Sequence, residues 1–151
     1  MIQVFSVTAT SPATQSVAVA TAGEFHGLDA YDDFTIDARL AGATGGALDV
    51  VLQRKIADDN WVDWLRFASV TAAAAAASFS FSTLGRGALA ATQILAVAKS
   101  TDAVPVAPTL TAGACVGGHP GNSLRVVFSA GASTTVGASQ TVVITAHQRA
   151  I

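Results

Sequence analysis

The segment of this sequence that most suggests chemistry is a glycine-rich turn, Gly85-Arg-Gly87-Ala-Leu-Ala90, followed downstream by Asp102. A G-x-G-x-x-A turn binds dinucleotide phosphates when a buried parallel strand leads into it and a helix begins after it. Here the preceding run alternates Phe79 and Phe81 with serines, which is typical of a half-exposed antiparallel strand, and no second β-α-β pattern is present. We therefore interpret residues 85–90 as a turn between strands and expect no cofactor.

Acidic residues gather in two places that could suggest a metal site. One group surrounds Tyr31 and comprises Asp29, Asp32, Asp33 and Asp37, and the other comprises Asp58, Asp59 and Asp63. A calcium loop needs several oxygens that converge on one ion, but the first group matches no standard spacing and lacks the glycine of an EF-hand turn. We expect both groups to be solvated turn residues and predict no metal site; the residues around Tyr31 would be the first to test.

Nucleophilic catalysis needs a serine or cysteine beside a histidine that an acid orients. The three histidines, His26, His119 and His147, fall in different segments, and no Gly-x-Ser-x-Gly turn is present. The single cysteine, Cys115, cannot form an intramolecular disulfide, and we expect it to be a small buried residue. Two aspartates could meet to form a hydrolase site in any fold, but nothing in the sequence selects the pair. The sequence thus predicts no catalytic residue and a protein that is not an enzyme.

Composition excludes several other classes of protein. The 151 residues are enough for one domain. Only 12% of them are charged, against about 25% in typical proteins. This low charge content excludes a coiled coil or a disordered tail. No run approaches the ~20 consecutive apolar residues of a membrane span, and residues 1–10 lack the pattern of a secretory signal. The net charge is −2 and the basic residues are scattered, so we expect neither nucleic acid nor a membrane as a partner.

Alternation with period two recurs along the chain and indicates half-buried strands. The cleanest run is 34–40, in which Phe34, Ile36, Ala38 and Leu40 share one face. Other runs lie at 48–53, 61–68, 78–82, 123–129 and 141–147, with weaker candidates at 2–8, 15–21 and 92–98. Turn residues separate them, so the sequence predicts an all-β chain, a single antiparallel β-sandwich of jelly-roll type with about eight strands over residues 1–151. Residues 1–14 are a candidate N-terminal arm, and residues 99–121 are a candidate contact loop.

Six residues are predicted to bind a partner. Trp61 and Trp64 fall on opposite faces of the expected strand 61–68, so we expect one of them to meet a second surface or a neighbouring chain. With Tyr31 they are the aromatic residues best suited to bind a protein or a glycan. The contact loop adds Val104, Pro105 and Pro108.

The hairpin resembles a family of small virion proteins of tailed bacteriophages, sandwich-like proteins of the capsid or tail. The resemblance rests on Leu48-Asp-Val-Val-Leu-Gln53, Asp58-Asp-Asn-Trp-Val-Asp63 and Arg66-Phe67, and later on Asn122-Ser-Leu-Arg-Val-Val-Phe128 and Thr141-Val-Val-Ile-Thr145. The turn differs from the family's hairpins because it carries Asn60 where glycines are common.

The resemblance implies a decoration or cement protein on the capsid exterior of the virion. Such a protein binds the outer face of the capsid lattice and bridges subunits of the major capsid protein, often as a homotrimer at local three-fold positions. A chain rich in small residues and poor in Lys and Glu suits this role. A tail or head-fibre component and a glycan-binding β-sandwich module that depends on Trp64 are the alternatives, and a hydrolase that depends on Asp32 and Asp33 is the third class.

Overall fold

The computed structural model describes residues 2–9, 18–31, 33–41, 43–44, 46–57, 60–69, 76–82, 110–116, 120–130, 135–136 and 140–147. In these ranges the chain is all-β, as predicted, and its strands form antiparallel sheets. The strands are β1 (Ile2–Ala9), β2 (Ala18–Phe25), β3 (Asp33–Ala41), β4 (Ala43–Thr44), β5 (Leu48–Ala57), β6 (Asn60–Arg66), β7 (Ala76–Ser82), β8 (Leu124–Ala130), β9 (Thr135–Val136) and β10 (Gln140–His147). A short 3-10 turn, η1 (Leu28–Ala30), joins β2 to β3.

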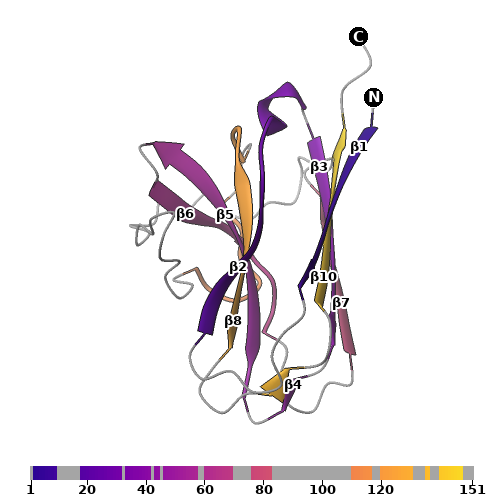
Figure 1. Ribbon diagram of the computed structural model, residues 1–151, viewed down its shortest axis with the longest axis vertical. Helices are drawn as coiled ribbons and strands as arrows, with labels where there is room; N and C mark the ends of the chain where they lie inside the picture. Colours follow the sequence, from indigo (N-terminus) through magenta and orange to yellow (C-terminus); the bar gives the residue numbers. More distant parts are fainter. Residues whose placement is uncertain are drawn as a thin grey trace.

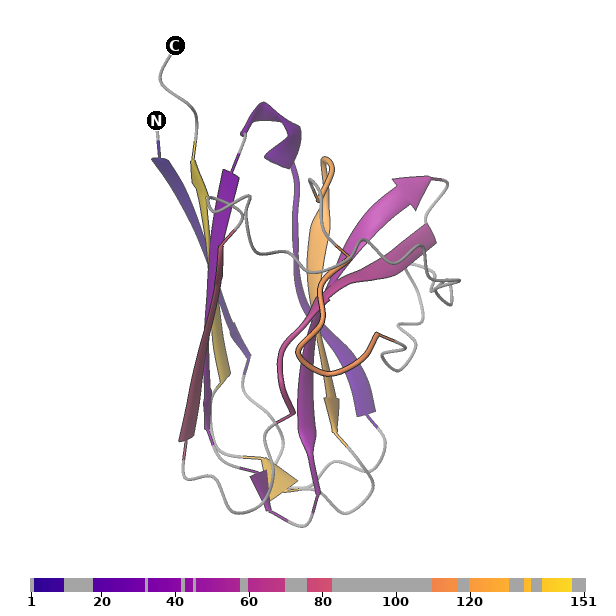
Figure 2. The ribbon, with the colours of Figure 1, turned by 180° about the vertical axis from the view of Figure 1, so that it is seen from behind.

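The eight longer strands form two four-stranded sheets that lie as two layers (Figure 1). One sheet has the order β1-β10-β3-β7 and the other has the order β2-β8-β5-β6, while β4 and β9 form a separate small pair. The pairs are nested in the sequence: β1 pairs with β10, β2 with β8, β3 with β7 and β5 with β6. Successive pairs alternate between the layers, so the chain is arranged like one long antiparallel hairpin divided between two sheets (Figure 2).

The apolar core uses the faces that the period-two pattern predicts. Phe34, Ile36 and Ala38 of β3 are buried, whereas Asp37 and Arg39 between and after them are exposed. On the neighbouring strand the buried residues are Val142, Ile144 and Ala146, and on the other sheet they include Leu48, Val50, Leu52, Leu124, Val126 and Phe128. All of these residues belong to one cluster, so the same core holds both layers together.

The β2-β8-β5-β6 sheet departs from the expected half-burial. At outward positions of β5 and β8, Val51, Gln53, Arg125 and Val127 are all buried. The prediction of half-burial is therefore wrong for this part of the sheet, where outward side chains are buried and bind one another: Arg125 bonds to Gln53 and lies against the ring of Trp61.

Residues 2–9 of the candidate N-terminal arm form β1, which pairs with β10 over its whole length. This part of the segment is a strand of the sheet rather than an arm, because β10 presents a full row of main-chain partners to it. Met1 and residues 10–14 lie outside the described residues, as do the expected strand at 92–98 and the glycine turn at 85–90.

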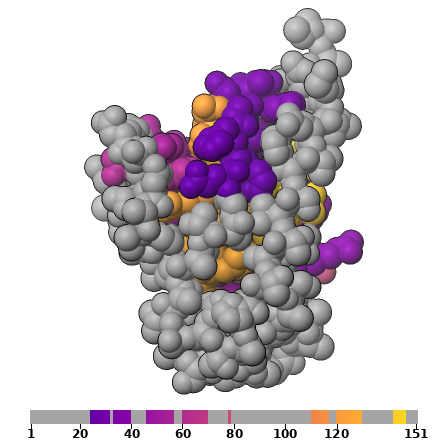
Figure 3. Space-filling model, in the orientation of Figure 1, coloured from indigo at the N-terminus to yellow at the C-terminus, as the bar shows by residue number. Residues whose placement is uncertain are grey.

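The turn between β2 and β3 is fixed by the segment that precedes β8. Gly27 has φ 77 and ψ 22, a left-handed conformation, and its N–H donates to Asn122 Oδ1 at 2.8 Å. The next amide, Leu28 N–H, donates to the Asn122 carbonyl at 3.1 Å. Figure 3 shows this turn, in indigo, on the surface beside the orange segment before β8. Leu28 is buried in the core, so the turn covers one end of the space between the sheets.

Ile144 tests the core between the layers. Ile144 is fully buried on a strand that pairs on both sides, so Ile144→Ala leaves a cavity and should lower the free energy of unfolding by about 2–5 kcal/mol. Chemical denaturation measures the change. Thr145→Ala, on the opposite face of the same strand, is the matched control and should cost much less; equal losses would contradict the assignment of the core face.

Gly27 tests the turn. A Cβ added at this position meets nothing within 4 Å, so the cost of Gly27→Ala comes from the positive φ alone and should be about 1–2 kcal/mol. Gly27→Asn should cost less, because asparagine adopts the left-handed region more readily. If both variants unfold at the same denaturant concentration as the native chain, the left-handed turn is not required.

Candidate functional site

A row of buried polar side chains crosses three strands on the outer face of the β2-β8-β5-β6 sheet. Gln53 lies opposite Arg125 of β8 on one side and opposite Asp63 of β6 on the other. Arg125 Nε donates to Gln53 Oε1 at 2.9 Å, and Gln53 Nε2 donates to Asp63 Oδ1 at 2.8 Å. These side chains, which we call the polar ladder, are 0% (Arg125), 2% (Gln53) and 3% (Asp63) exposed. Burial of charged groups at this level requires hydrogen-bonded partners, and the ladder supplies them.

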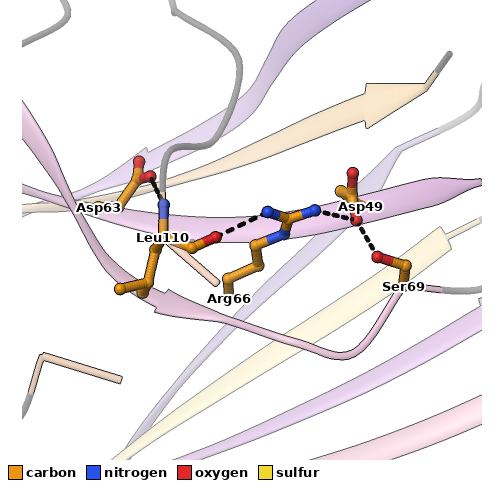
Figure 4. Close-up of polar contacts among 5 residues, drawn as sticks. All are labelled: Asp49, Asp63, Arg66, Ser69 and Leu110. Atoms are coloured by element: carbon orange, nitrogen blue, oxygen red, sulfur yellow. Dashed lines mark hydrogen bonds and ion pairs between the residues drawn. The ribbon is translucent and has the colours of Figure 1, made fainter. Parts of the chain in front are cut away.

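The ladder ends on a segment that we call the strap, residues 110–116. The second carboxylate oxygen of Asp63 accepts the N–H of Leu110 at 3.0 Å. Arg66 Nη1 donates to the Leu110 carbonyl at 2.7 Å, while its Nη2 lies 2.9 Å from Asp49 Oδ1, which also accepts from the Ser69 hydroxyl. Figure 4 shows Asp63 and Arg66 on either side of the Leu110 main chain, with Asp49 and Ser69 beyond the Arg66 guanidinium. Asp63 and Arg66 of β6 thus bind the N–H and the C=O of Leu110, respectively.

Main-chain pairing with the edge of β6 holds the rest of the strap. Arg66 N–H donates to Ala114 O at 2.9 Å, Val116 N–H donates to Trp64 O at 2.8 Å, and Gly113 N–H donates to Arg66 O at 3.0 Å. Leu65 and Cys115 are the antiparallel partners between these bonds. The strap therefore acts as a short extra edge strand, and Cys115 is half-buried and packs against the core.

Trp61 lies on the outer face, next to the ladder. It is opposite Lys55, and the Arg125 guanidinium carbon is 4.7 Å from the centroid of its ring, with Lys55 Nζ at 5.5 Å. The ring is fully buried. One tryptophan was expected to meet a second surface or a neighbouring chain. Trp61 lies on the outer face, where two cations of the same sheet lie against its ring, and its binding to a partner stays a prediction.

The other predicted partner-binding residues are placed as follows. Trp64 is fully buried in the core, and Tyr31 is half-buried and packs against the same core. Neither tryptophan presents a surface for stacking. Val104, Pro105 and Pro108 lie outside the described residues.

Asp63 corrects the interpretation of the second acidic group as a solvated turn. It lies inside β6, with a bond to the ladder from one oxygen and to the strap from the other. Asp58 and Asp59 are outside the described residues. The signal that sequence reasoning missed was the apolar character of outward positions near Asp63, namely Val51, Trp61 and Val127, which indicates a covered outer face.

The fold also brings together a serine and a histidine that the sequence keeps far apart. His26 Nδ1 is 2.9 Å from Ser123 Oγ, and His26 Nε2 is 3.8 Å from Glu24 Oε2. Ser123 is 5% exposed, whereas the side chains of His26 and Glu24 are 62% and 38% exposed. The hydroxyl is too enclosed to meet a substrate in this conformation, so the arrangement supports the same turn that Asn122 holds.

No set of three or more His, Cys, Asp or Glu side chains in the described ranges is placed to bind a metal ion. Within those ranges no helix has the length and apolar character of a membrane span. Comparisons with protein-family models, with curated proteins and with solved structures found no match.

Gln53 tests the ladder. Gln53→Leu preserves the approximate side-chain volume but removes the acceptor of Arg125 and the donor to Asp63, which leaves two buried charged groups short of a partner. We expect a loss of at least about 1–3 kcal/mol of unfolding free energy, measured in urea. Arg39→Leu places leucine on an exposed position of β3 and should change stability by about 0.5 kcal/mol or less. A Gln53→Leu protein as stable as this control would show that the ladder contributes nothing.

Proposed function

We propose that this chain is a β-sandwich of jelly-roll type and serves as a structural virion protein that decorates and cements a phage capsid. The observation that carries the fold assignment is the nested pairing of β1 with β10, β2 with β8, β3 with β7 and β5 with β6 across two layers. A jelly roll has this strand arrangement, and the architecture is found in viral capsid and lectin domains.

A jelly roll does not by itself select between these two functions, since fold and function are separable. The aromatic side chains favour the structural role. A lectin that stacks sugars on tryptophan needs an exposed ring, but Trp61 and Trp64 are both fully buried, so the glycan-binding alternative loses its two principal candidates.

The closed outer face of the β2-β8-β5-β6 sheet also supports a scaffold. Charged residues make up only 12% of the chain, and several of them are used inside the protein. Asp63 and Arg125 are in the ladder, and Arg66 and Asp49 are ion-paired beside the strap. This arrangement stiffens one layer of the molecule, which suits a protein that must present a fixed shape to neighbouring subunits.

In the proposed role the chain forms a homotrimer on the capsid exterior and bridges subunits of the major capsid protein. A stable interface of this kind buries upwards of about 1,000 Å². Bridging contacts of this size stabilise a shell because each copy holds two or more subunits in a fixed relation.

Capsids assembled without the protein provide the direct test. Purified chain should sediment with these capsids in a saturable way and raise their resistance to heat, and sedimentation equilibrium should give three times the mass of one chain. Electron microscopy of the decorated particles would locate the added density, on the shell for the cement role or on the tail or head fibre for the alternative. A monomer that binds neither capsid nor tail would refute the proposal.

A further inference from the structure

We draw no further inference here: the strongest candidate, the outer face of the β1-β10-β3-β7 sheet, where Asp37 and Arg39 of β3 and Ser78 of β7 are exposed, carries none because nothing in the structure shows what covers it.

Discussion

The carboxylate of Asp63 is the constraint on which the outer layer of this protein depends. A carboxylate that is 3% exposed costs several kcal/mol in lost hydration unless hydrogen bonds replace the water. Asp63 obtains them from Gln53 on one oxygen and from the Leu110 main chain on the other. These two bonds couple the middle of the sheet and a segment 47 residues away through one side chain.

This coupling makes the two layers of the molecule unequal. In the β1-β10-β3-β7 sheet the outer face of β3 carries exposed Asp37 and Arg39, so this strand is buried on one face only. In the other sheet residues 50–53 of β5 and 124–128 of β8 are buried on both faces. The outer layer there is neither a second apolar core nor a solvated surface. It combines apolar Val51 and Val127 with the polar ladder and with Trp61 under two cations. The sequence thus contains few charged residues, yet several of them are buried inside the fold and bound to other side chains.

The strands and their inward faces could be predicted from the sequence because period-two alternation is a local property. Phe34, Ile36 and Ala38 illustrate it, since each is buried and each follows an outward residue. The outward faces could not be assigned in the same way. Alternation shows that two faces differ, but it does not show whether the polar face is exposed, because a contact such as that of Asp63 with Leu110 joins residues 47 positions apart in the sequence. Asp63 was consequently assigned to a solvated turn. Valines and a tryptophan at outward positions were the available sign of a cover, because a solvated face has little use for them.

The ladder also explains how the sheet selects one register. Side chains alternate between faces along a strand, so a slip of one residue between β5 and β8 would place Gln53 on the core side or leave Arg125 opposite an apolar residue. In either case a buried guanidinium or carboxylate would lose its hydrogen bonds, at a cost that apolar packing alone would not impose. An all-apolar sheet of valines and leucines tolerates such a slip more readily because its neighbours are nearly equivalent. The three polar residues lie at partnered positions on three adjacent strands, so each pair of strands is fixed by a contact that only the native alignment allows. The Asp63 carboxylate also accepts the N–H of Leu110, so one side chain contributes both to the alignment of the sheet and to the docking of the strap.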